Sequence, residues 1–214
     1  GNGKLANINN GTVISNTGAI NVKSGTIESA YRGIYSEGTG AIVTLDGGQI
    51  IANGGSGIYA YGGQVKIKSG EIKIQGNNGN GVYVDNNGSA SLSMTGGKIS
   101  SSSVSSPRGV YCGSYSYPRS CSFTGGEIDI TGSSAMGIYS GYNTISDFKI
   151  SANGSSAMGI YDSSTTTITN SEITATGSSS YGICGRSTTI NSSTITGGTS
   201  GIRSSTATIN SSNL

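Results

Sequence analysis

Residues 124–139 read TGGEIDITGSSAMGIY, and variants of this stretch recur along most of the chain. The closing tripeptide has eight copies, separated by steps of 24, 24, 28, 28, 22, 23 and 19 residues. The copies are Gly33-Ile34-Tyr35, Gly57-Ile58-Tyr59, Gly81-Val82-Tyr83, Gly109-Val110-Tyr111, Gly137-Ile138-Tyr139, Gly159-Ile160-Tyr161, Gly182-Ile183-Cys184 and Gly201-Ile202-Arg203. A period of about 22 residues with tolerated insertions indicates a solenoid, in which each repeat is one coil that contacts only its neighbours.

Apolar residues also pair at a spacing of five, around a turn that often contains glycine. The pairs are Ile8/Val13, Val22/Ile27, Leu45/Ile50, Ile67/Ile72, Met94/Ile99, Phe123/Ile128, Ile145/Ile150, Ile168/Ile173, Ile190/Ile195 and Ile209/Leu214. Glycine accepts the positive φ of such corners at no steric cost. On each side of the turn, apolar and polar residues alternate with period two, as in Glu127-Ile128-Asp129-Ile130, which predicts strands.

Together the two patterns predict an all-β fold, a single-domain parallel β-helix (β-solenoid) over residues 1–214. We expect about nine to ten coils of about 22 residues, each with three short strands. Like strands of successive coils then pair in parallel, and a right-handed crossover is the default for such sheets. The first coil, about residues 1–27, is expected to be short and irregular, and residues 113–120 are expected to form an inserted loop.

Composition narrows the function classes. The net charge is +2 and charged residues make up 10% of the chain, too little for the clustered Lys and Arg of nucleic-acid binding. The chain has no His, the commonest metal ligand and general base, and its ten acids are scattered. We therefore expect no catalytic residue, no metal site and no cofactor. No apolar run approaches the ~18 residues of a membrane span.

The tyrosines of the repeated tripeptide form the first outward column. Because the neighbouring Ile faces inward, alternation turns each tyrosine outward. This tyrosine strip consists of Tyr35, Tyr59, Tyr83, Tyr111, Tyr139 and Tyr161, and it continues into Cys184 and Arg203. Two interpretations remain open: the rings pack on one another along the solenoid, or the strip docks a sugar chain or another protein.

A second outward column precedes the apolar residue that follows the turn, and its charges alternate in sign over five coils. This charge ladder consists of Glu71, Lys98, Glu127, Lys149 and Glu172. Opposite charges on neighbouring strands fix the register, which is the interpretation that we favour. The alternative is a glycosidase-type pair of carboxylates, Glu127 and Asp129. However, Lys98 and Lys149 flank Glu127 and favour its charged form, whereas a general acid needs the opposite.

A third outward pattern consists of two ranks of short hydroxyl and amide side chains. The ranks are Ser93/Thr95, Ser122/Thr124, Thr144/Ser146, Thr167/Thr169, Thr189/Asn191 and Thr208/Asn210. They resemble the Thr-x-Thr faces of solenoid ice-binding proteins. Lys66, Lys68 and Asp46 interrupt the face in the N-terminal coils, so ice binding is the third of our hypotheses.

The chain has three cysteines. Alternation places Cys112 and Cys121 inward, on strands that flank one corner and the inserted loop. We expect a disulfide between them, which fits an oxidising compartment; the alternative is a pair of small buried thiols. Cys184 takes a tyrosine position and is expected to be a partly exposed free thiol.

Neither end of the repeat shows a cap. The C-terminus reaches the second apolar position at Leu214, and the Ile8/Val13 pair already obeys the repeat, with only its Gly-Ile-Tyr arm missing. Open strand edges with apolar residues are templates for a further coil. We therefore expect that the polypeptide continues or that copies of the chain stack end to end.

Repeats such as residues 124–139 resemble those of bacterial surface β-helix proteins, including autotransporter-like adhesins and the wider pectin-lyase-like superfamily. The resemblance covers the chain from about residue 8 and implies an extracellular or cell-surface location with an adhesive or scaffolding role. The leading hypothesis is a non-enzymatic adhesin stalk or structural fibre, whose partners are other copies, neighbouring coils, glycans or another surface protein. The alternative is a carbohydrate-binding or carbohydrate-active module of pectin-lyase-like type. No catalytic residue of that superfamily carries over, because the enzymes cluster Asp with Arg or Lys on one face, or use His-containing motifs.

Overall fold

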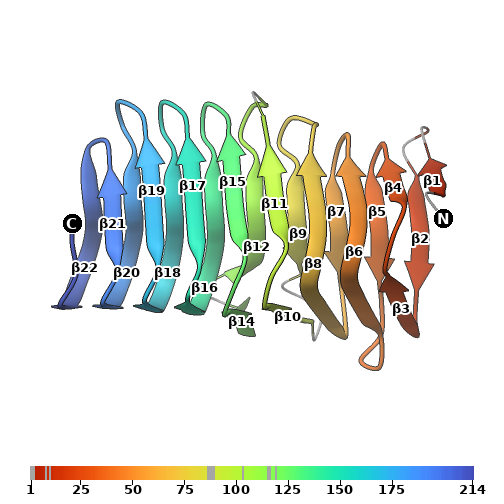
Figure 1. The fold of residues 1–214 in the computed structure, drawn as a ribbon, viewed down its shortest axis with the longest axis horizontal. Coiled ribbons are helices and arrows are strands. Elements are labelled where there is room, and N and C mark those ends of the chain that lie inside the picture. Colours follow the sequence, from red (N-terminus) through yellow and green to blue (C-terminus); the bar gives the residue numbers. More distant parts are fainter. Residues whose placement is uncertain are drawn as a thin grey trace.

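A computed structural model describes residues 3–7, 9, 11–85, 90–102, 104–114, 117–118 and 120–214. This part of the chain contains 22 strands and no helix. Figure 1 shows the strands stacked along one long axis, with the two ends of the chain at opposite ends of the rod. The structure is a β-solenoid of parallel, stacked coils, as the repeats predict.

The Gly-Ile-Tyr strands form the first of three parallel stacks, which we call the tyrosine face. Its strands are β2 (Thr12–Asn16), β5 (Arg32–Ser36), β7 (Ser56–Ala60), β9 (Asn80–Val84), β12 (Arg108–Ser114) and the first parts of β16 (Met136–Ser146), β18 (Met158–Thr169), β20 (Tyr181–Asn191) and β22 (Ser200–Asn210). The repeated tripeptides lie directly over one another in this stack. Tyr111 pairs with Tyr83 on one side and with Tyr139 on the other.

The strands before each turn form the second stack, the hydroxyl face. They are β3 (Ala19–Val22), the first parts of β6 (Ile42–Ala52) and β8 (Gln64–Ile74), then β10 (Ser91–Met94), β14 (Ser120–Phe123) and the last parts of β16, β18, β20 and β22. Within the inserted loop, β13 (Tyr117–Pro118) pairs antiparallel with β12. Tyr115, Ser116 and Arg119 of that loop lie outside the described residues.

The strands after each turn form the third stack, the charge face. They are β1 (Lys4–Asn7), β4 (Thr26–Ser29), the second parts of β6 and β8, then β11 (Lys98–Ser101), β15 (Glu127–Thr131), β17 (Lys149–Asn153), β19 (Glu172–Thr176) and β21 (Thr194–Gly197). The three short strands per coil thus follow from the alternation on either side of each turn.

The solenoid has about eight turns of about 23 residues, fewer than the nine to ten coils expected. The first coil also differs from the prediction, because Ile14 pairs with Ile34 and Ser15 with Tyr35. Residues 12–16 are therefore the Gly-Ile-Tyr arm of that coil, and the prediction that this arm is missing was wrong. Ile8, the other member of the predicted Ile8/Val13 pair, lies outside the described residues.

The core explains why each tripeptide begins with glycine. Ile138 and Ile150 are both fully buried. A Cβ atom on Gly137 would lie 2.4 Å from the carbonyl oxygen of Gly159 and 2.5 Å from Cγ2 of Ile150. Glycine is therefore needed here for close approach. The glycine of the tripeptide therefore contacts the apolar residue that follows the turn, so the two sequence patterns describe one contact.

The predicted disulfide is present. Cys112 of β12 and Cys121 of β14 are both buried and bonded to each other, with Cα atoms 6.5 Å apart. Both point into the core, as alternation predicts. Cys184 is a free, half-buried thiol.

Candidate functional site

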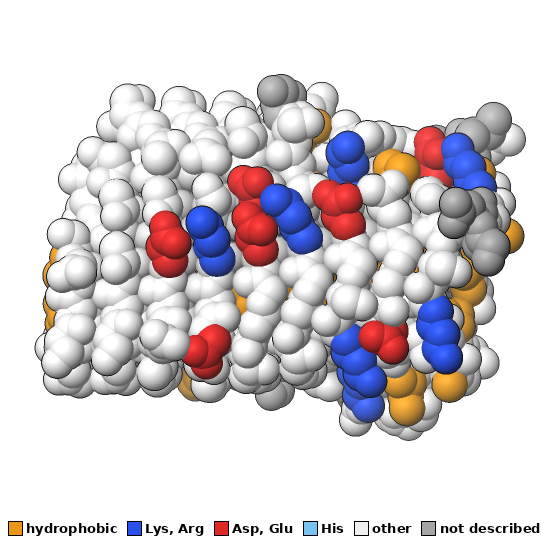
Figure 2. Space-filling view, viewed as in Figure 1, with side chains coloured by type: hydrophobic (Ala, Val, Ile, Leu, Met, Phe, Trp, Pro, Cys, Tyr) orange, Lys and Arg blue, Asp and Glu red, His pale blue; other side chains and the backbone are white. Residues whose placement is uncertain are grey.

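The charge ladder lies in one register along the charge face. Lys98 pairs with Glu71 on one side and with Glu127 on the other, and Lys149 stands between Glu127 and Glu172. Figure 2 shows acidic and basic side chains alternating in one row across this face. Nζ of Lys98 lies 3.5 Å from Oε1 of Glu127, and Nζ of Lys149 lies 3.6 Å from Oε2 of Glu172.

One carboxylate of the ladder, Glu71, is held in its charged form by hydrogen-bond donors. Glu71 accepts hydrogen bonds from the hydroxyl of Ser100 at 2.6 Å and from the amide of Gln49 at 2.9 Å. The Ser100 hydrogen bond is the main cause that lowers the pKa of Glu71, against the opposing effect of burial.

Asp129, the second acid of the glycosidase alternative, lies with its Oδ2 3.2 Å from Nζ of Lys98. Burial alone would lower the pKa of Lys98, but its contacts with Asp129 and Glu127 outweigh that effect and raise the pKa. This lysine therefore stays charged between the two acids. A general acid needs a carboxyl group that keeps its proton near neutral pH, and a shared ammonium group opposes that.

The tyrosine strip is a continuous stack of rings. Ring centroids from Tyr59 to Tyr161 are 4.9, 4.4, 4.9 and 5.1 Å apart, and neighbouring planes differ by 2–16°. Tyr35 joins the stack at 5.7 Å with a tilt of 38°. The rings are half-buried and turn their faces toward one another. Inside the stack, only ring edges and hydroxyl groups therefore remain for a ligand.

Burial raises the pKa of several phenols of the strip. Burial raises the pKa of Tyr83 to about 12, and the neighbouring Tyr111 adds to the shift. Burial, followed by the hydrogen bond that its hydroxyl donates to Asp85, also raises the pKa of Tyr59. Burial is again the first cause of the raised pKa of Tyr139.

Arginine covers the first rings of the strip. The guanidinium carbon of Arg32 lies 3.9 Å from the ring centroid of Tyr59 and 5.1 Å from that of Tyr35. Such a cation over an aromatic face stabilises by about 0.5–1 kcal/mol at exposed sites. This end of the stack is therefore closed by the protein itself.

The other end of the strip is open. Tyr161 pairs with Cys184 in the next coil, and Cys184 pairs with Arg203. Because a cysteine stands where the stack would continue, a hollow of about 430 Å³ lies beside Tyr161. Its lining consists of Met158, Tyr161, Cys184, Gly185, Arg203, Ser204 and Ser205. The sequence shows the break in the tyrosine column as Gly182-Ile183-Cys184, which predicts the free thiol but not the hollow.

The hydroxyl face carries one rank in strict register. Ser93, Ser122, Thr144, Thr167, Thr189 and Thr208 pair in succession from β10 to β22. Toward the N-terminal end, Lys66 occupies the position that pairs with Ser93. The flat hydroxyl array therefore ends at β10.

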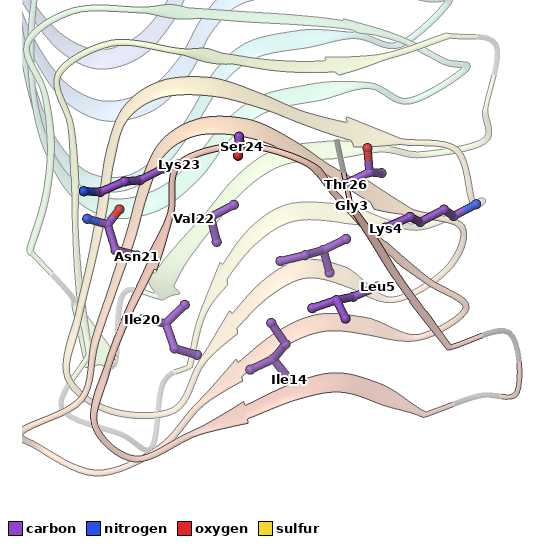
Figure 3. A pocket seen from close by; sticks show the side chains of 11 residues that line it. Gly3, Lys4, Leu5, Ile14, Ile20, Asn21, Val22, Lys23, Ser24 and Thr26 are labelled. Carbon is purple, nitrogen blue, oxygen red and sulfur yellow. The ribbon is translucent and has the colours of Figure 1, made fainter. Parts of the chain in front are cut away.

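The N-terminal end of the solenoid exposes the apolar interior. A hollow of about 470 Å³ is lined by side chains that include Leu5, Ile14, Ile20, Val22 and Ile27. Figure 3 shows the labelled Leu5, Ile14, Ile20 and Val22 directed into the coil interior. Leu5 remains 55% exposed, so this end presents the core column to solvent.

Comparison with protein-family models, curated protein sequences and solved structures gives no match. The described residues contain no group of three or more His, Cys, Asp or Glu side chains that could hold a metal ion. Nor does a helix long and apolar enough to cross a membrane occur among them. The β-solenoid fold is shown, whereas the membership of a bacterial surface family stays a prediction from the repeats.

Proposed function

We propose that this chain is a non-enzymatic structural β-solenoid, a stalk or fibre segment of an extracellular or cell-surface protein. The stacked tyrosine strip is the observation that carries the proposal. The faces of neighbouring rings stack on one another, with ring centroids 4.4–5.1 Å apart. The strip therefore stabilises the rod along its length. The charge ladder does the same on the charge face, because each charge stands opposite its counterion.

The disulfide and the open N-terminal end support the location and the partners in this proposal. Cys112 and Cys121 are bonded, and stable disulfides belong to oxidising compartments outside the cytosol. The partner that fits the exposed core column around Leu5 is another coil, which a neighbouring copy or neighbouring sequence would supply. Such stacking would extend the rod.

The second candidate function is carbohydrate binding, and the hollow beside Tyr161 favours it over a carbohydrate-active enzyme. An enzyme of glycosidase type would need a carboxyl group that gives up a proton, whereas Glu127 and Asp129 both contact the ammonium group of Lys98, at 3.5 and 3.2 Å. Ice binding is the third candidate, supported by the hydroxyl rank and weakened by Lys66 within the same face.

Substitution of the central rings tests the structural role. Tyr83→Ser combined with Tyr111→Ser removes three ring contacts, each stabilising by about 0.5–1.5 kcal/mol beyond area burial. We therefore expect the free energy of unfolding to fall by about 1.5–4.5 kcal/mol in a denaturant titration. Tyr142→Ser is the matched control, because Tyr142 is 48% exposed and takes no part in the stack. Unchanged stability in the double variant, together with loss of binding to cells or to other copies, would refute the structural role.

A further inference from the structure

We propose that Asp162 makes the C-terminal coils of the solenoid sensitive to pH, because the buried corner around its carboxyl group accommodates the protonated acid and disfavours the anion. The inference concerns a conformational property of the rod and is independent of the structural role proposed above. It rests on three observations: a change from apolar to polar side chains at one inward corner, two buried oxygen atoms that lack a donor, and neighbouring strands that direct no cation toward them.

The corner lies between the tyrosine face and the hydroxyl face, where the inward positions change character along the rod. In earlier coils these positions hold Val84 and Leu92, and then the disulfide of Cys112 and Cys121. Figure 1 shows the strands that follow, β16, β18 and β20, side by side in the C-terminal half of the rod. Their inward positions at this corner hold buried polar side chains, which we call the polar corner: Ser140, Asn143, Asp162, Thr166 and Thr188.

Two oxygen atoms of the polar corner are buried without a hydrogen-bond donor. Asp162 is 3% exposed, and its Oδ1 accepts a hydrogen bond from the amide of Ser164 at 2.7 Å, but its Oδ2 accepts none. Asn143 donates from Nδ2 to Oγ1 of Thr166 at 3.1 Å, but its Oδ1 accepts none. The same Thr166 hydroxyl group interacts with the carboxyl group of Asp162, so the two side chains belong to one network. A buried acceptor without a donor costs free energy, and the cost is larger when the acceptor is charged.

The neighbouring coils do not supply the missing donor. On one side, the hydroxyl group of Ser140 donates to the carbonyl oxygen of Tyr142 at 3.2 Å. On the other side, a Cβ atom on Gly185 would lie 3.2 Å from Cβ and 3.7 Å from Oδ2 of Asp162. Because Gly185 has no side chain, bare backbone covers the carboxyl group closely on this side and donates nothing to its Oδ2.

The strands packed against Asp162 direct no charged side chain toward it. All residues of β16 to β20 are described, and none of their titratable side chains other than Asp162 is buried. The others are half-buried or exposed, and they are Tyr139, Tyr142, Lys149, Tyr161, Glu172, Tyr181, Cys184 and Arg186. The groups that act on the pKa of Asp162 are accordingly uncharged: burial comes first, followed by the amide of Ser164 and the hydroxyl group of Thr166.

Protonation supplies the donor that the polar corner lacks. A proton on Oδ2 turns this acceptor into a donor, and Oδ1 of Asn143 is an acceptor in the same network. Ionisation instead leaves a buried charge without a counterion. Burial therefore raises the pKa of Asp162, and the folded chain holds this proton more tightly than the unfolded chain. The resulting stabilisation is complete below the ordinary aspartate pKa of about 4 and is lost as the pH rises through the higher value of the folded state.

Ionisation of Asp162 is expected to loosen the coils around it rather than the whole rod. Each coil of a solenoid contacts only its neighbours, so opening can be confined to a few coils. The strands that open more often at higher pH are therefore β18 and its partners β16 and β20. The N-terminal coils, whose inward positions at this corner hold apolar side chains such as Val65 and Leu92, keep their stability.

The experiment compares the whole chain with Asp162→Asn, which keeps the shape of the side chain and removes its titration. Amide hydrogen exchange is followed by mass spectrometry, always with both proteins at the same pH. We expect the exchange rate of β18 and β20 in the wild type, relative to that in Asp162→Asn, to rise several-fold from about pH 4 to about pH 8. The corresponding ratio for β6 and β8 should not change with pH. Asp46→Asn removes an exposed carboxyl group of β6 and is the matched control, which should behave as the wild type does.

A second measurement keeps the test independent of how well one variant folds. NMR of isotope-labelled aspartate carboxyl carbons follows the protonation of Asp162 in the wild type directly. The signal is assigned by its loss in Asp162→Asn or in Asp162→Ser, which restores the residue that Ser140 supplies in the preceding coil. We expect a titration midpoint above the ordinary value of about 4.

Three results would overturn the proposal: a midpoint of Asp162 at or below its ordinary value, a ratio of exchange rates that stays constant with pH, or a specific effect of a cation. For the last, Ca²⁺ or Na⁺ would slow exchange in β18 of the wild type at about pH 8 and leave Asp162→Asn unchanged, which would identify the polar corner as a cation site. None of these outcomes bears on the structural role, which the unfolding of the Tyr83 and Tyr111 variant tests separately.

Discussion

Gly137→Ala tests the contact that couples the two sequence patterns. The new Cβ atom would lie 2.4 Å from the Gly159 carbonyl oxygen and 2.5 Å from Cγ2 of Ile150, whereas ordinary contacts begin at 3.4 Å. Both neighbours must therefore yield by about 1 Å, and one of them is backbone held in the strand ladder. Overpacking of this kind costs about 1–3 kcal/mol. The smaller entropy of the unfolded Ala chain offsets about 0.4–1 kcal/mol of that cost.

We expect a net loss of about 1–2 kcal/mol for Gly137→Ala, measured by denaturant unfolding with circular dichroism. Gly40→Ala is the matched control, since nothing lies within 4 Å of its Cβ position and its φ is not positive. That control should be neutral or stabilise by up to about 1 kcal/mol. Equal midpoints for the two variants would refute the close approach of Gly137 to Ile150 and the packing argument built on it.

Three further predictions concern charge, protonation and the disulfide. Lys98→Glu places like charges beside Glu127 and should destabilise by about 1–2 kcal/mol at low salt; an equal loss at high salt would contradict the electrostatic cause. Because the pKa of Tyr83 is raised to about 12, the folded state holds this proton more tightly than the unfolded chain. Stability should therefore be complete below about pH 10 and fall as the pH rises toward about 12, followed by melts and phenolate absorbance. Reduction of Cys112–Cys121 should lower stability by about 2–3 kcal/mol, and alkylation of the native protein followed by mass measurement should modify only one thiol. Three modified thiols would contradict the bridge.

The fold could be predicted because two independent residue patterns describe one contact. Seven of the eight tripeptide glycines leave room for the branched apolar residue after a turn, as Gly159 does for Ile173. A shift of either residue by one position would turn the inward side chains of its strand outward and the outward ones inward. The register of the strands therefore follows from the spacing alone. For the same reason the charge ladder and the tyrosine strip could be placed on outward columns before the structure was known.

The arm of the first coil was not predicted because it keeps only the isoleucine of the Gly-Ile-Tyr repeat. Thr12–Asn16 has Ile14 at the inward position but Ser15 in place of tyrosine. The coil is recognisable only by its pairing with β5. A single-sequence pattern depends on the repeated side chains, whereas the backbone needs only an inward apolar residue and an unpaired neighbouring strand.

The later corners also differ from the glycine turns that the sequence suggests. Asp147, Asn170 and Ser192 adopt the left-handed conformation there, with φ of 51°, 48° and 49°. Serines close these corners: the hydroxyl of Ser171 donates to the Thr169 carbonyl at 2.7 Å, and the amide of Ser171 donates to the Ser193 hydroxyl at 3.0 Å. Asn and Asp tolerate this conformation by local hydrogen bonding, so hydroxyl side chains replaced the glycine signal.

In a column of repeated side chains, each member interacts with the equivalent side chain of the next coil. This limits the places where such a rod can bind a ligand. Each ring of the strip stacks on the ring of the next coil, and each charge of the ladder lies opposite a counterion in the next coil. A regular column therefore leaves few unpaired groups that could bind a ligand. Binding capacity arises where a column is broken. The ring column is broken at Cys184, which pairs with Tyr161. The inward column beside it also changes character, since Ser140 and Asp162 stand where the earlier coils carry Val84 and Cys112. The C-terminal coils are therefore the part of the rod in which these two columns no longer repeat.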